Sequence, residues 1–86
     1  MDPSKALSDI RGYALAGRIV LTRHARARMR QRGADFADVR HALCGATSCS
    51  SAEEEGKWKI RGPDRDGDDL TCVVAVENGV IVVTVL

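Results

Sequence analysis

Residues 70–86 read LTCVVAVENGVIVVTVL, and this stretch predicts a β-hairpin. Side chains alternate between the two faces of a strand, so one face of the first strand holds Leu70, Cys72, Val74 and Val76. Asn78-Gly79 is typical of a tight hairpin turn because both residues tolerate positive φ angles. Val80 to Leu86 is almost wholly apolar, as expected of a strand that is central or covered on both faces. We therefore expect a sheet at the C-terminal end of the chain.

The residues before this hairpin extend the predicted sheet. Residues 57–61, KWKIR, alternate strictly, so Trp58 and Ile60 are expected to face the core while the charged side chains point away. Gly62 to Asp69 resembles a calcium loop in its alternating aspartates but lacks the spacing and the closing glutamate, which favours a polar hairpin loop. We expect an antiparallel meander of three or four strands over about residues 57–86.

The first half of the chain predicts three helices. The expected N-caps are Asp2, Thr22 and Asp35, and the glycines that follow each periodic stretch are Gly17, Gly33 and Gly45. Apolar residues at helical spacing predict the core-facing stripe of the third helix, namely Phe36, Val39 and Leu43. Ile19 to Leu21 is expected to be a short extended link. The fold predicted is α+β, one domain over residues 1–86, with helices of about 3–45 packed on the sheet.

The amino-acid composition limits the kinds of function that this chain is expected to have. The chain has 86 residues, of which 44% are hydrophobic and 29% charged, values ordinary for a soluble globular domain. Aromatic residues make up 3%, which argues against modules that stack bases on an aromatic platform. The N-terminal residues lack the pattern of a secretory signal, and no apolar run approaches membrane-spanning length, so we expect a cytoplasmic protein without membrane contact.

The cysteines do not predict a metal site. His41, Cys44 and Cys49 superficially have ligand spacing, but a closed zinc site usually needs four ligands in regular pairs, and Cys72 falls in a strand-like run. An odd number of cysteines fits a reducing compartment better than a disulfide framework. We expect three free thiols, no metal and no cofactor.

Charge divides unevenly along the chain. Residues 1–45 hold nine Lys and Arg against four Asp and Glu, whereas residues 46–86 hold four against eight, including the run Glu53 to Glu55. That acidic run is interpreted as a solvated segment, with screening of the basic half as the alternative. The excess of positive charge in the first half indicates an acidic partner, either nucleic acid or protein.

Residues 22–33, TRHARARMRQRG, hold five arginines and a histidine. On a helix, His24, Arg28 and Arg32 form one stripe that borders the apolar side of Ala25 and Met29. The face expected to meet water carries Arg23, Arg26 and Arg30. The outer arginines are either solvated surface or a polyanion-binding face. For the inner ones, the partner is either a structural acid, Asp35 or Asp38, or an anion supplied from outside.

A family resemblance adds to these expectations. The pattern LTxHAxxRMxxRG over residues 21–33, together with KIRG at 59–62 and VVTV at 82–85, resembles the domain-of-unknown-function family numbered 4258. That family is similar in turn to the RelE/ParE and BrnT group of bacterial toxins, which implies helices packed on an antiparallel sheet. Family members commonly have Ile-Ser where this chain has Ala34-Asp35, and many end in an aromatic where this chain has Val85-Leu86.

The resemblance implies a toxin-like, metal-independent ribonuclease whose partners are RNA, free or on the ribosome, and a cognate antitoxin. The catalytic residues expected are His24, Arg28 and Arg32, and the RNA-binding residues expected are Arg26, Lys59, Arg61 and Thr84. Neighbouring arginines disfavour an imidazolium, which keeps His24 neutral and able to accept the proton of the attacking 2′-hydroxyl. Arginine forks suit the clamping of phosphate. A second proton-transfer group, His41 or Tyr13, is not placed by the sequence.

Two other hypotheses stand beside this one. In the first, the domain is a non-catalytic binding module that docks an acidic protein or nucleic acid through its basic helix. In the second, Arg28 and Arg32 are structural and tie the helix to the rest of the domain.

Overall fold

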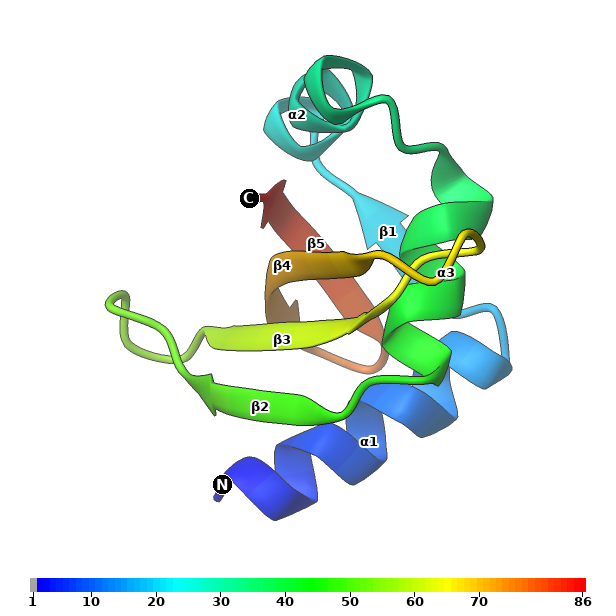
Figure 1. The fold of residues 1–86 in the computed structure, drawn as a ribbon. Helices are drawn as coiled ribbons and strands as arrows, with labels where there is room; N and C mark the ends of the chain where they lie inside the picture. The colour runs from blue at the N-terminus through cyan, green and yellow to red at the C-terminus, as the bar shows by residue number, and fades with distance from the viewer. Residues whose placement is uncertain (1) are drawn as a thin grey trace.

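Three helices and one five-stranded sheet make up the computed structural model over the residues it describes, 2–86 (Figure 1). The elements in chain order are α1 (Pro3–Leu15), β1 (Ile19–Leu21), α2 (Arg23–Arg32), α3 (Phe36–Cys44), β2 (Ser48–Ser51), β3 (Trp58–Pro63), β4 (Asp69–Val76) and β5 (Val80–Val85). The strands lie in the order β1-β5-β4-β3-β2. None of the helices within this described range has the length and apolar character needed to cross a membrane.

The α+β class is confirmed, but the sheet is larger than predicted. Strands β2 to β5 form an antiparallel meander, and β1 adds a fifth strand that runs parallel to β5. The predicted meander is present as four antiparallel strands, but it begins at Ser48 rather than near residue 57, and the parallel strand β1 was not predicted. Ile19–Leu21 is too short to show a period of its own, and Ser48–Ser51 consists of residues without the β-branched or aromatic character that marks a strand.

The helix boundaries follow the predicted caps. The side chains of Asp2, Thr22 and Asp35 each accept a hydrogen bond from the backbone N–H three residues later, which satisfies one of the donors that a helix start leaves free. Gly33 ends α2 with a left-handed φ of 69°, a conformation that favours glycine. Gly45 ends α3, and α1 ends at Ala16, one residue before the predicted Gly17.

Two arginines join α1 to α3. Arg40 of α3 donates to the carbonyls of Ala14 and Leu15 at the end of α1, at 3.1 and 3.0 Å. Arg11 of α1 donates to the Cys44 carbonyl at the end of α3, at 3.3 Å. The last carbonyls of a helix have no donor within the helix, so each helix supplies donors to the end of the other. This reciprocal arrangement requires the two helices to run antiparallel.

The core lies between this helix pair and one face of the sheet. It consists of small and aliphatic side chains, and Val39 and Leu43 of the predicted α3 stripe are fully buried in it. Phe36, predicted in the same stripe, is 43% exposed. That prediction was wrong because helical periodicity gives the direction of a side chain but not where along the helix its neighbours end. Trp58 is half-buried at the margin of the core rather than inside it.

α3 approaches β3 most closely at Gly62. A Cβ atom added there would clash with the main-chain oxygen of Ala42 and lie 3.0 Å from the Ala46 Cα. Both neighbours are backbone atoms, so relief would require α3 to move off the sheet. The glycine therefore sets the spacing between these two layers of the domain.

We expect Gly62→Ala to lower the free energy of unfolding by at least about 2 kcal/mol, as for other overpacked core sites. Gly12→Ala is the matched control, because Gly12 lies within α1 with nothing within 4 Å of its added Cβ. Alanine there should stabilise the helix by about 0.5–1 kcal/mol. Urea unfolding followed by circular dichroism measures both. Equal stability of the two variants would contradict the close packing at Gly62.

Candidate functional site

The arginine-rich helix α2 lies at the C-terminal end of β5, apart from α1 (Figure 1). It follows β1 directly and places Ala25 and Met29 in the core, as the helical pattern predicts. The remainder of its surface is polar, and it carries all five arginines of the predicted stretch. The basic segment is thus fixed on a helix that packs on the domain through one narrow side.

The edge of β5 explains how α2 is attached. β1 pairs with β5 only from Val80 to Val82, so the rest of that edge has no strand beside it. Thr22, the N-cap of α2, supplies donors to the first carbonyls beyond β1: its N–H donates to the Val82 carbonyl at 3.1 Å and its Oγ1 to the Val83 carbonyl at 2.9 Å. Arg28 supplies the next donor, because its Nε donates to the Val85 carbonyl at 3.1 Å. The N-cap and one side chain of α2 therefore supply the hydrogen-bond donors that a neighbouring strand would otherwise provide.

Arg28 and Arg32 do not pair with an acid, contrary to the structural alternative that named Asp35 or Asp38. Arg28 donates to the Val85 carbonyl and, through Nη1, to the Gln31 side chain at 2.9 Å, while Arg32 donates to the main-chain oxygen of Leu86. The two acceptors of Arg28 are neutral and leave its positive charge uncompensated. That the two arginines tie α2 to β5 agrees with the structural hypothesis in its broader form.

The two aspartates instead hold Arg65, which the sequence did not single out. Arg65 lies in the β3–β4 loop, and its guanidinium reaches Asp35 at 2.7 Å and Asp38 at 3.1 Å. The backbone N–H of Asp35 and the Arg65 guanidinium both donate to the Asp38 carboxylate and hold its pKa below the usual value. This cluster fastens the start of α3 to the loop and uses the acids nearest to α2.

None of the five arginines of α2 forms an ion pair with an Asp or Glu side chain in the range 2–86. Arg23, Arg26 and Arg30 are exposed, as predicted. The acidic run Glu53 to Glu55 makes no ion pair with them either, so it does not screen this helix by contact. Arginines four residues apart, such as Arg26 and Arg30, repel one another along the helix. The result is a concentrated positive surface.

His24 lies in the first turn of α2 and is exposed. Its ring makes no hydrogen bond to any residue that the structure describes, so nothing in that range orients it. The two candidates for a second proton-transfer group lie on other helices and are engaged there. His41 contacts the Pro63 carbonyl through Nδ1 at 2.8 Å, and Tyr13 lies under the Arg18 guanidinium at 5.8 Å. The structure therefore does not bring a second such group to His24.

Lys59 and Arg61 form a separate basic group on the face of the sheet opposite the helix pair. Strand register aligns Arg61 with Ser48 and Thr71, and a shallow groove of about 220 Å³ is lined by Ser48, Ser50, Lys59, Arg61 and Thr71. Thr84 lies on β5 opposite Val73, with β4 between it and Lys59. Two strand spacings, about 10 Å, thus separate β3 from β5. The serines were missed because β2 was not predicted.

The cysteines stay apart as free thiols. Burial raises the pKa of the Cys72 thiol to about 12 and also raises that of Cys49. Thiols with raised pKa values are poor nucleophiles and poor metal ligands at neutral pH. Among residues 2–86, no group of three or more His, Cys, Asp or Glu side chains is placed to hold a metal ion.

Comparison with known families gives one match. The model of the family described as "Domain of unknown function (DUF4258)" matches residues 21–86, a span that includes α2 and the whole meander. A comparison with curated proteins found no match.

Because Arg28 bonds to the edge of β5 whereas Arg26 points to solvent, the two should differ in their effect on stability. We expect Arg28→Ala to lower the free energy of unfolding by about 1–2 kcal/mol, since it removes a charged donor from a part-buried carbonyl. Arg26→Ala should change it by less than about 0.5 kcal/mol. Thermal unfolding of both variants checks this. Unchanged melting of Arg28→Ala would show that the bond to Val85 does not stabilise the fold.

Proposed function

The chain belongs to the family described as "Domain of unknown function (DUF4258)", and since that description assigns no activity, we propose a function from the site: the protein binds RNA through phosphate groups held on α2. One observation carries the proposal. Five arginines lie on a ten-residue helix, and none pairs with an Asp or Glu side chain within residues 2–86. A polyanion supplies the missing negative charge.

The chemistry of the arginines supports phosphate as the ligand. A guanidinium presents five N–H donors in a planar fork that matches a phosphate. Arg28 and Arg32 use part of that set on β5 and leave N–H groups free to bind an anion. The same bonds hold α2 in place, so the outer arginines are mounted on a fixed element.

The surface of α2 is suited to contacts with the phosphate backbone of RNA rather than with its bases. α2 carries no aromatic side chain on which a base could stack, and the chain has only Tyr13, Phe36 and Trp58. Phosphate contacts position a nucleic acid without reading its sequence. Among polyanions we choose RNA because of the resemblance to the RelE-like toxins. The antitoxin that the resemblance also implies would be an acidic protein that competes for the same arginines.

Binding by phosphate contacts predicts a characteristic salt dependence. We expect the affinity for single-stranded RNA to fall steeply with salt, and Arg26→Gln to reduce the slope of log K against log salt by about 0.7. Fluorescence anisotropy with a labelled RNA of mixed sequence measures the slope. Lys5→Gln removes one charge from α1, where Lys5 pairs with Asp9, and serves as the control. Equal slopes for the two variants would contradict binding at α2.

The position of His24 favours a second candidate, metal-independent cleavage of the bound RNA. The exposed imidazole lies one turn before Arg28, on the helix proposed to hold the phosphates. In such a reaction the 2′-hydroxyl attacks the adjacent phosphorus and His24 accepts the hydroxyl proton, while an arginine stabilises the charge that develops on the phosphorane oxygens. The bond from phosphorus to the 5′-oxygen then breaks, and water donates a proton to that oxygen, which leaves a 2′,3′-cyclic phosphate and a 5′-hydroxyl. Lys59 and Arg61 would contact the RNA further along the sheet.

For this second candidate we expect His24→Ala to reduce chelator-resistant RNA cleavage by at least about 100-fold while leaving RNA affinity unchanged. The assay uses a mixed RNA pool with chelator present and ribosomes in a parallel reaction. His24→Gln, which keeps a polar side chain but cannot transfer a proton at neutral pH, should be equally inactive. Cleavage by His24→Ala at the wild-type rate would exclude the histidine mechanism and leave RNA binding in place.

A further inference from the structure

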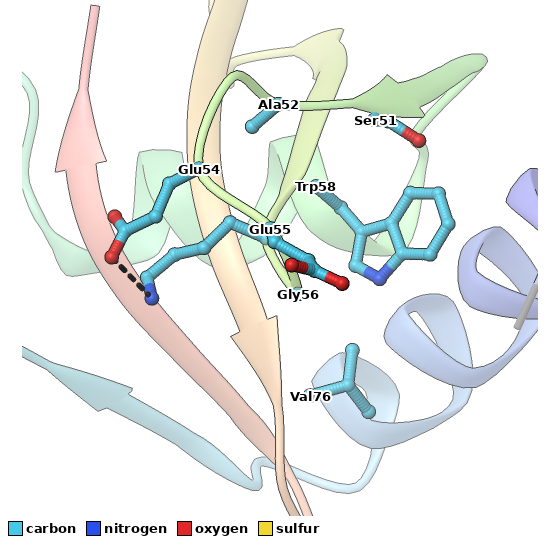
Figure 2. Close-up of a pocket in the computed structure, with 8 residues that line it drawn as sticks. Ser51, Ala52, Glu54, Glu55, Gly56, Trp58 and Val76 are labelled. Atoms are coloured by element: carbon cyan, nitrogen blue, oxygen red, sulfur yellow. Dashed lines mark ion pairs between the residues drawn. The ribbon is translucent and has the colours of Figure 1, made fainter.

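A second concave site lies beside Trp58, in the hairpin that joins β2 to β3. The hollow measures about 480 Å³, and its lining includes Glu54, Glu55, Lys57, Trp58 and Val76 (Figure 2). The strict alternation of β3 predicts Trp58 as a core residue, yet its ring is half-buried and lines this hollow. The sole tryptophan of an aromatic-poor chain therefore forms a wall of a surface pocket.

The two glutamates of this pocket differ in their partners. The Glu54 carboxylate forms an ion pair with the Lys57 ammonium at 3.3 Å, so its negative charge is already compensated. Glu55 has no ion pair within residues 2–86, and its side chain extends toward the indole in Figure 2. Val76 lies below the ring and adds an aliphatic surface. The pocket thus combines an aromatic face, an apolar floor and one uncompensated carboxylate.

We propose that the Trp58 pocket binds a guanidinium group, such as that of an arginine side chain. A guanidinium is planar and weakly hydrated, so it stacks on an indole face while its N–H fork meets a carboxylate. Each part of an arginine side chain has a matching group in the pocket. The Trp58 indole would stack on the guanidinium plane, Glu55 would accept its N–H donors, and Val76 would contact its methylene groups. The tightly hydrated ammonium of a lysine fits this combination less well.

The arginine can come from two sources, and this pocket holds the same group in both cases. One is the outer face of α2 on a second copy of this chain, where Arg23, Arg26 and Arg30 are exposed. The other is an arginine of a different molecule. If a second copy is the source, self-association and RNA binding compete for the same arginines of α2. This competition rests on the proposed function, whereas binding of a guanidinium at the Trp58 pocket does not rest on it.

Trp58 makes the test direct, because all tryptophan emission of the protein arises at the pocket. The probe is N-acetyl-arginine amide, titrated into the full chain at constant ionic strength, with N-acetyl-citrulline amide as its neutral counterpart. We expect a saturable change in emission with the arginine compound and none with the citrulline compound. Glu55→Gln should weaken binding by about fivefold, the effect of losing one exposed ion pair. Glu53→Gln removes the same charge from the same loop outside the pocket and should bind as the wild type does.

Three results would overturn the proposal. These are equal responses to the arginine and citrulline compounds, a response that does not saturate, and equal weakening by Glu53→Gln and Glu55→Gln, which would mean attraction to the loop's overall charge. Dilution of the unliganded protein separates the two sources. An emission change with protein concentration that Glu55→Gln removes identifies a second copy, whereas constant emission with intact probe binding assigns the pocket to an arginine of another molecule. RNA affinity is measured separately at α2, so failure of either proposal is distinguishable from failure of the other.

Discussion

β5 extends beyond the reach of β1, and the carbonyls that it leaves on that edge must find donors. The structure meets this constraint with α2. Thr22 uses its N–H and its hydroxyl on two successive carbonyls, and Arg28 uses its Nε on Val85. An edge strand protected in this way cannot pair with another chain along that segment. The position of α2 and the register of its side chains both depend on these few bonds.

This attachment gives the arginines of α2 two physical roles. Arg28 donates to the Val85 carbonyl and Arg32 to the main-chain oxygen of Leu86, so both attach α2 to the end of the sheet without using an Asp or Glu side chain. The nearest acids of the helical half, Asp35 and Asp38, are held by Arg65 instead. Arg23, Arg26 and Arg30 form no ion pair with an Asp or Glu side chain within residues 2–86, and those four residues apart repel one another along the helix. The proposed polyanion would compensate this charge.

Local interactions made much of this fold predictable. Each helix begins at a cap whose partner lies three residues away, and the β4–β5 hairpin turns at Asn78-Gly79, where Asn78 has a φ of 56°. The features that were missed depend on distant partners. β1 joins a strand about 60 residues further along the chain, which no local pattern reports, and Arg65 finds Asp38 across 27 residues. At the candidate site, the helical stripe of His24, Arg28 and Arg32 was predictable, but the carbonyls that Arg28 binds became evident only from the strand order.

The charge asymmetry between the two halves of the sequence becomes an asymmetry in space. α2 lies at one end of β5, whereas the loop that carries Glu53 to Glu55 projects from the side of the sheet where β2 and β3 join (Figure 1). A polyanion approaching the domain is attracted by the first region and repelled by the second, so it meets the molecule in a restricted range of orientations. On the open face of the sheet the two charges meet, because Glu53 and Glu54 line a hollow with Lys59, next to the separate groove of Lys59 and Arg61. In the proposed complex, RNA held on α2 would reach Lys59 and Arg61 only against the repulsion of this acidic loop, which favours α2 as the main binding surface.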